Sequence, residues 1–183
     1  MKIPSLVMAA LAVMALASPS HAAGNCNTKA SQVWAASPTQ KLTVEALADG
    51  PTCPQAVVMI AIRNSQGDLL WFEVSRTSDI MILSQPQAKN AKAMTALLKQ
   101  WITPDAHLKT ADLLPKWKEN ANFPEAGELP FYPDEGTGHG DYVKMQKAKL
   151  PMFCYVAGME SQACLVLMQD GTIVKVGSQS FPG

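Results

Sequence analysis

Two apolar runs on either side of a polar turn, within residues 55–75, constrain the fold of this chain more than any other stretch. Residues 57–62 are six consecutive apolar side chains. This run is rich in β-branched types and too short for a stable helix, so it predicts a strand buried on both faces. Residues 70–75 alternate instead, which predicts a half-exposed neighbouring strand with its even-numbered, uniformly apolar side facing the core. Gly67 in the turn can adopt positive φ, so we expect a hairpin at the centre of an antiparallel sheet.

The first 22 residues have the three parts of a signal peptide. Lys2 gives a positive start, an apolar run of about 15 residues follows, and Ser20 and Ala22 are the small residues of a cleavage site. The alternative is a membrane anchor, but the run is shorter than the ~20 residues that span a bilayer. We therefore expect residues 1–22 to be removed and residues 23–183 to form one periplasmic or secreted domain.

The charge balance of the remaining chain argues against two classes of partner. One of the 15 basic residues, Lys2, is removed with the leader, so the remaining chain has 14 basic and 15 acidic side chains. Such a chain has no net electrostatic attraction to nucleic acid or to an anionic membrane. We therefore expect neither nucleic-acid binding nor membrane insertion after the leader is removed. The sequence does not determine the oligomeric state.

The cysteines predict two disulfides. There are four of them, all after the leader, and an even number in an exported chain indicates a disulfide framework. A hairpin folded about Met159 places Cys154 directly opposite Cys164, at a separation that a disulfide can bridge. Cys26 would then pair with Cys53. The cysteines lack the spacing of a redox or metal motif, so we assign them a structural role and predict no metal site.

Residues 88–102 carry the clearest helical pattern in the chain. Ala91, Met94, Leu98 and Trp101 recur on one side, and lysines occupy another. We expect this helix to pack on the hairpin through Met94, Leu98 and Trp101. The C-terminal region predicts three further strands in a meander whose two faces are both apolar, so each face needs cover.

The connection between the helix and the meander, residues 103–140, is unusually long. Five prolines and several aromatic side chains interrupt it, so it is either a binding loop or an ordered wrap that covers the sheet. The wrap is the simpler interpretation. If a ligand site exists, we expect Trp117, Phe131 and Tyr132 to line it, because aromatic side chains give large contact area at low entropic cost.

A cluster of carboxylates, glycines and one imidazole, residues 134–141, ends this connection. His139 and Asp141 within it are candidates for the polar edge of the ligand site. They also suit an acid–base pair or a metal site, although the spacing matches no calcium or zinc motif. The alternative is an exposed turn in which Asp141 caps a short helix that ends near Lys147.

Together these elements predict an α+β protein with a single antiparallel sheet of about five strands and one main helix. Residues 79–83 predict an additional short strand, residues 42–47 fit either an edge strand or a helical turn, and residues 27–37 predict an irregular lead-in. The element order is similar to that of profilin-like and PAS-like domains. This resemblance implies an architecture and not a function.

Three functional hypotheses follow from these observations. The first is a non-catalytic binding or sensory module for a small ligand, without a cofactor. The second is an interaction factor or inhibitor that acts on an envelope or secreted protein through an aromatic patch or the hairpin tip at Met159. The third and weakest is a hydrolase-type or metal-assisted enzyme that uses His139 or His107. The chain has no catalytic or nucleotide-binding motif, and we assign no catalytic residue.

Overall fold

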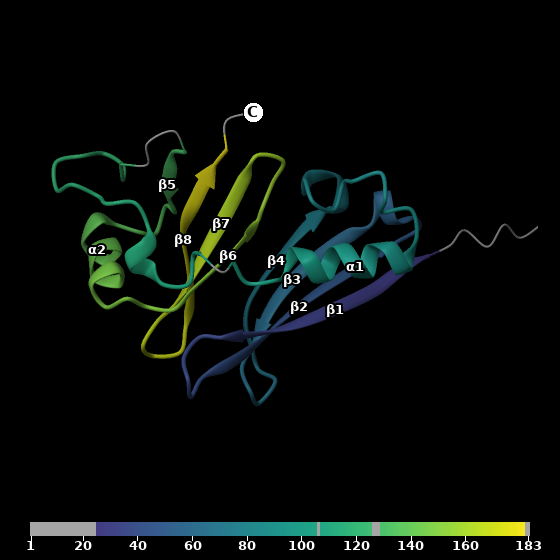
Figure 1. The fold of residues 1–183 in the computed structure, drawn as a ribbon, viewed down its shortest axis with the longest axis horizontal. Coiled ribbons are helices and arrows are strands. Elements are labelled where there is room, and N and C mark those ends of the chain that lie inside the picture. The colour runs from purple at the N-terminus through teal and green to yellow at the C-terminus, as the bar shows by residue number, and fades with distance from the viewer. Residues whose placement is uncertain (1–24, 106, 126–128, 182–183) are drawn as a thin grey trace, which may run out of the picture.

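The computed structural model describes residues 25–105, 107–125 and 129–181, and the predicted signal peptide lies outside these residues. The described chain forms two antiparallel four-stranded sheets and two α-helices (Figure 1). The N-terminal sheet has the order β1-β2-β3-β4, and the C-terminal sheet has the order β5-β8-β7-β6. The strands are β1 (Cys26–Ala35), β2 (Lys41–Gly50), β3 (Val57–Arg63), β4 (Leu69–Arg76), β5 (Phe131–Pro133), β6 (Met152–Val156), β7 (Ser161–Leu167) and β8 (Ile173–Ser180), and the helices are α1 (Ala91–Trp101) and α2 (His139–Lys147).

The α+β class is confirmed, but the prediction of a single sheet of about five strands is wrong. Residues 27–37, expected to be irregular, belong mostly to β1, and residues 42–47 lie inside β2, which pairs with strands on both sides. Residues 79–83 form no strand; a 3₁₀ turn (Thr77–Asp79) and further turns occupy this region. The two additional N-terminal strands complete a sheet of their own, and the C-terminal meander therefore forms a second one.

Helix α1 covers the half of the N-terminal sheet formed by β1 and β2. The Asn90 side chain accepts a hydrogen bond from the backbone N–H of Ala93 (3.0 Å) and caps the helix. Met94, Leu98 and Trp101 are its buried side chains, as predicted. The predicted partner of the helix is wrong, however, because α1 lies over β1 and β2, the two strands that the sequence did not reveal, and not over the β3–β4 hairpin. In Figure 1, α1 lies across the N-terminal sheet, whereas α2 lies at the opposite end of the molecule, beyond the C-terminal sheet.

The predicted core face of β4 is wrong. Phe72 and Val74 are 55% and 52% exposed, and Trp71 and Glu73 face the interior instead. Trp71 packs edge-on against Tyr155 of the C-terminal sheet, with ring centroids 5.7 Å apart. Alternation shows that a strand has two faces without showing which one is buried. Here the inner face receives the larger aromatic ring, and the Glu73 carboxylate finds a hydrogen-bond donor there.

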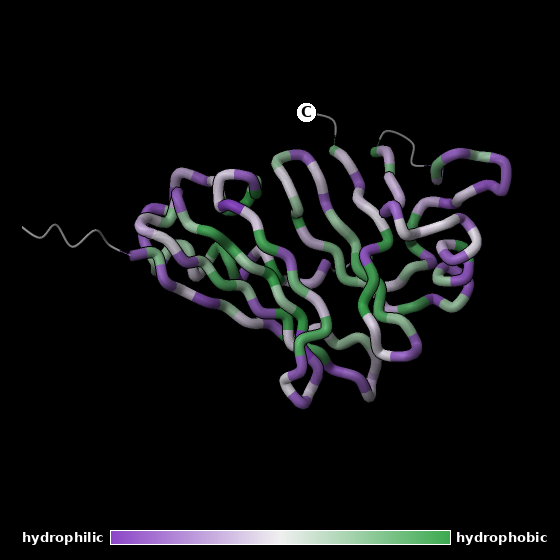
Figure 2. Tube along the Cα trace, turned by 180° about the vertical axis from the view of Figure 1, so that it is seen from behind, coloured by the Kyte–Doolittle hydropathy of each residue, from purple (hydrophilic) through white to green (hydrophobic). Residues whose placement is uncertain are grey.

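The C-terminal sheet is covered on both faces, as its two apolar sides predicted. One face contributes Phe153, Tyr155 and Leu165 to the core that it shares with the N-terminal sheet. The other contributes Met152 and Val166 to a second core under α2 and the long connection. Figure 2 shows the resulting pattern, with hydrophobic stretches along the strands and hydrophilic ones at the hairpin turns.

Both predicted disulfides are present. Cys26 bonds to Cys53 with a Cα–Cα distance of 4.7 Å, and Cys154 bonds to Cys164 with a distance of 4.1 Å. Cys154 and Cys164 are directly opposed in the β6–β7 pair, as the hairpin register predicted. The other bond ties the start of β1 to the 3₁₀ turn (Cys53–Gln55) that precedes β3.

A tyrosine joins the two sheets, and removing its hydroxyl should destabilise the protein. The buried Tyr155 hydroxyl donates to the Glu73 carboxylate (2.9 Å). We expect Tyr155→Phe to lower the free energy of unfolding by about 1.5 kcal/mol, the low end for a hydrogen bond to a charged group, because Glu73 is only partly buried. Urea unfolding measures this loss. Tyr132→Phe, which removes a hydroxyl from a 49% exposed side chain, is the matched control and should have little effect.

The same substitution should flatten the alkaline side of the stability profile. Burial raises the pKa of Tyr155, and the charge of Glu73 and their hydrogen bond raise it further. Above pH ~10 an unfolded tyrosine loses its proton while Tyr155 retains it in the folded state, so stability falls as the pH rises. The fall should be shallower in Tyr155→Phe. Identical slopes for the two proteins would contradict this role for the hydroxyl.

Candidate functional site

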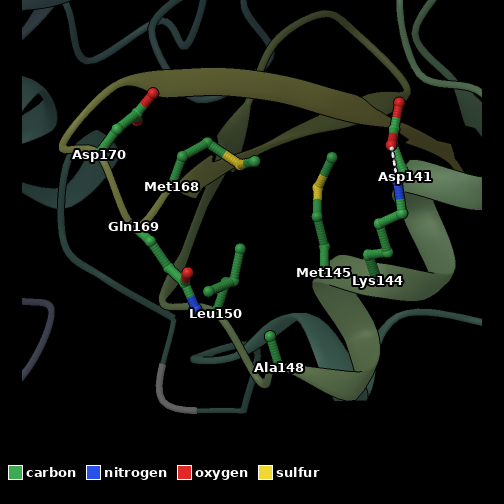
Figure 3. A pocket seen from close by; sticks show the side chains of 8 residues that line it. All are labelled: Asp141, Lys144, Met145, Ala148, Leu150, Met168, Gln169 and Asp170. Atoms are coloured by element: carbon green, nitrogen blue, oxygen red, sulfur yellow. Dashed lines mark hydrogen bonds and ion pairs between the residues drawn. The ribbon is translucent and has the colours of Figure 1, made fainter.

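A mostly apolar cavity of about 340 Å³ lies between α2 and the turn that follows β7. Figure 3 shows the side chains of Met145 and Met168 entering it from opposite sides, with Leu150 and Ala148 on a third side. The carboxylates of Asp141 and Asp170 lie at its edge. Its complete lining is Asp141, Lys144, Met145, Ala148, Leu150, Met168, Gln169 and Asp170.

Two tight backbone turns place the apolar lining. At the end of α2, Lys149 adopts a positive φ of 50°, and the Leu150 N–H then donates to the carbonyl of Met145 (3.2 Å). This turn brings Leu150 back beside the helix. At the other wall, the Met168 N–H donates to the Thr172 carbonyl (2.8 Å) across a turn in which Gly171 has φ +88°.

The mouth of the cavity carries two carboxylates and one ammonium group. Lys144 donates to Asp141 (2.9 Å) one turn along α2. Asp170 accepts from both the hydroxyl and the backbone N–H of Thr172, and these bonds lower the pKa of the Asp170 carboxyl. Asp170 is therefore ionised at neutral pH, and the mouth has an excess of one negative charge.

The structure distributes the five candidate ligand-binding residues over three places. Asp141 lines the cavity. Trp117, Phe131 and His139 belong instead to an aromatic cluster around Tyr142, with ring centroids of Trp117 and Tyr142 5.3 Å apart. Phe131 is buried in this cluster. Tyr132 is half exposed, and its only described aromatic neighbour is Phe123, 6.0 Å away and 57% exposed.

His139 and Asp141 do not bond to each other. The Trp117 carbonyl can only accept, so the His139 Nε2 at 3.0 Å donates to it, while Asp141 binds Lys144. Helix α2 begins at His139, and its N-cap, Gly138, has no side chain, so Asp141 lies in the first turn and is not the cap. Among the described residues no three His, Cys, Asp or Glu side chains come together as a metal site.

Side chains of α2 donate hydrogen bonds to backbone carbonyls of the long connection and hold the two segments together. Tyr142 donates from its hydroxyl to Pro115 (2.8 Å), and Gln146 donates from its side-chain amide to Leu114 (2.9 Å). Leu114 is buried beneath the same helix. This part of the connection therefore wraps the second face of the C-terminal sheet and supports the helix that forms one wall of the cavity.

Sequence reasoning did not find four of the lining residues, Met145, Ala148, Leu150 and Met168. Each looked like an ordinary apolar residue near the end of a helix or strand. They converge only because α2 packs beside the β7–β8 turn, a contact between segments about 20 residues apart. No motif marks that contact, and the nearest signal was the tight turn at Gln169–Gly171.

Comparisons with protein-family models, with curated proteins and with solved structures found no match. In the part of the chain that the structure describes, no helix has the length and apolar character needed to cross a bilayer.

Proposed function

We propose that the protein is a non-catalytic binding module for a small, largely apolar ligand, and that the ligand occupies the cavity between α2 and the β7–β8 turn. The observation that supports this proposal is the cavity itself. Its volume of about 340 Å³ falls in the range of ligand pockets, roughly 300 to 1,000 Å³, and apolar walls with a few polar groups at the mouth are typical of such pockets.

The lining indicates the chemistry of the ligand. The thioethers of Met145 and Met168 are polarisable, and their unbranched side chains adapt to ligands of different shape. Thioether sulfur also contacts aromatic rings favourably. An aromatic or branched aliphatic body suits these walls, and a neutral or cationic head group suits the negative mouth. The site requires no cofactor.

We further propose that the module acts in the periplasm or outside the cell. Two features support this location. The first 22 residues have the pattern of a cleavable leader, and the two disulfides suit an oxidising compartment. A ligand taken up there would be an extracellular or envelope metabolite rather than a cytosolic cofactor.

A second candidate function, binding of an envelope or secreted protein, has one observation in its favour. Phe123 and Tyr132 pack against each other and are both about half exposed. Paired exposed aromatic rings are common at protein interfaces. This pair is small, however, and it lies apart from the residues that line the cavity, so we place it second.

Methionine methyl groups provide a direct test of ligand binding. With ¹³C-methyl-labelled methionine, titration of the protein with indole or phenol should shift the NMR signals of Met145 and Met168, because both side chains enter the cavity. The signals of Met94, buried under α1, and Met59, on the N-terminal sheet, should stay in place. A mutant that fills the cavity, Ala148→Trp, should abolish the shifts.

The control for this mutant is Lys147→Trp, which adds the same ring at the preceding, exposed position that does not line the cavity. It should bind the probes like the parent protein. The proposal fails if no small apolar probe moves the Met145 and Met168 signals, or if Ala148→Trp responds like the parent protein.

A further inference from the structure

The outer face of the N-terminal sheet, opposite α1, is apolar along β3 and β4. Val57, Phe72 and Val74 are each at least half exposed, and Met59 lies between them, partly buried. Monomeric proteins rarely leave several large apolar side chains side by side on a sheet. No helix or loop of the described chain lies over this face in the way that α1 lies over the other.

The register places these side chains in rows across the sheet. Val74, Met59, Leu47 and Lys29 form one row, and Phe72, Ala61, Glu45 and Ser31 form the next. In these two rows β4 and β3 contribute only apolar residues, β2 contributes Leu47 and Glu45, and β1 contributes the charged Lys29 and the polar Ser31. The face therefore has an apolar half beside a polar half.

We infer that a second copy of this chain covers this face, and that the two N-terminal sheets pack face to face about a two-fold axis running across the strands, between these two rows. Such an axis places β4 over β4 and β3 over β3, so the two apolar halves bury each other. An axis along the strands through the middle of the sheet would instead place β4 over β1, with Val74 against Lys29.

Side-chain size is complementary in this arrangement. Rotation about the axis exchanges the two rows, so Phe72 of one chain faces Val74 of the other, and Met59 faces Ala61. Ala61 has no exposed surface, which leaves a depression between its larger neighbours, and Met59 is a flexible side chain that can fill it. A large residue opposite a small one at each step allows two faces to interdigitate.

The charges at the rim are also complementary. Exchange of the rows brings Lys29 beside Glu45 of the second chain, and Asp49 beside Arg63. Within one chain, Arg63 already binds Glu45 (2.8 Å), so the polar half contains both signs at close spacing. A rim of mixed sign around an apolar centre suits a protein surface, and here the same surface supplies both partners.

Sedimentation equilibrium of the purified protein tests this inference. We expect the mass of two chains at high concentration and dissociation on dilution. Val74→Lys places a charge in the apolar half and should give the mass of one chain at every concentration. Val33→Lys is the matched control. Val33 is 58% exposed on the same outer face, in β1, and its substitution should leave self-association unchanged.

The Met59 methyl signal gives a second measurement that locates the contact. Its NMR shift should change with protein concentration in the parent protein and in Val33→Lys, and should stay constant in Val74→Lys. The signals of Met145 and Met168 should not depend on concentration, so this result is independent of ligand binding. A single-chain mass at high concentration, or equal effects of the two lysine substitutions, would overturn the inference.

Discussion

Phe153→Ala is expected to lower the free energy of unfolding by about 3 to 5 kcal/mol, the range measured for buried phenylalanines. Phe153 lies on β6, where the C-terminal sheet meets the N-terminal one. Its ring is 1% exposed, and its centroid lies 5.6 Å from that of Trp34 and 6.1 Å from that of Tyr155. Because these neighbours come from both sheets, the resulting cavity cannot close unless one sheet moves relative to the other.

The size of this loss is large relative to the stability of a typical domain, about 5 to 15 kcal/mol. Urea unfolding followed by circular dichroism measures it, and the near-ultraviolet spectrum should also change because Trp34 loses its aromatic neighbour. Phe123→Ala is the control, since that ring is 57% exposed, and its cost should stay within about 0.5 kcal/mol. A loss below 1 kcal/mol for Phe153→Ala would show that the two sheets do not share one core.

Local patterns were sufficient to predict the elements whose partners are near in sequence. The β3–β4 hairpin follows from two apolar runs and a glycine turn, and Gly67 has the positive φ expected there (90°). The buried side of α1 follows from helical periodicity. The Cys154–Cys164 bond follows from the register of a short hairpin. In each case the residues that decide the structure lie within about 20 positions of one another.

The number of sheets could not be predicted in this way. β1 is an edge strand whose inner side includes Thr28, Ala30 and Gln32, and these small or polar residues pack under α1. They give no apolar alternation, so the sequence reads as irregular. β2 has a clear alternation of buried residues, from Leu42 to Ala48, but its strand character is recognisable only together with β1 and β3.

Most of the residues that line the cavity could not be predicted from the sequence, for the same physical reason. We predicted that aromatic residues of the long connection line a ligand site, because such residues are rare outside regular structure in this sequence. Most of them are used to hold the connection onto α2, as the buried Phe131 and the Trp117–Tyr142 contact show. The cavity is lined instead by methionine and other aliphatic side chains from two separate elements, and no local pattern encodes their convergence.

Removal of the Cys26–Cys53 disulfide by the double substitution Cys26→Ala/Cys53→Ala should cost about 3 to 4 kcal/mol. The bond joins residues 27 positions apart, and the entropy of the unfolded chain that a disulfide removes increases with the length of the loop. Cys154 and Cys164 are 10 positions apart, so Cys154→Ala/Cys164→Ala should cost less, roughly 3 kcal/mol or slightly below. Both pairs are buried, and alanine leaves a similar void in each case.

The two losses should also differ in where the protein opens. Cys26 is the first residue of the edge strand β1 and pairs with Gly50 of β2. The backbone of Gly50 is so close to Ala56 that a Cβ added to Gly50 would lie 2.6 Å from the Ala56 Cα. Without its disulfide, the first residues of β1 have only one neighbouring strand, so their amide hydrogen exchange should accelerate while β7 stays protected. The Cys154–Cys164 pair also joins an edge strand, β6, to its neighbour. It lies in the middle of the β6–β7 register, with paired residues before and after it, so its removal should produce no such local opening. If Cys154→Ala/Cys164→Ala lowered the free energy of unfolding more than Cys26→Ala/Cys53→Ala, the packing of the sulfur atoms in the second core would contribute more to stability than chain entropy does.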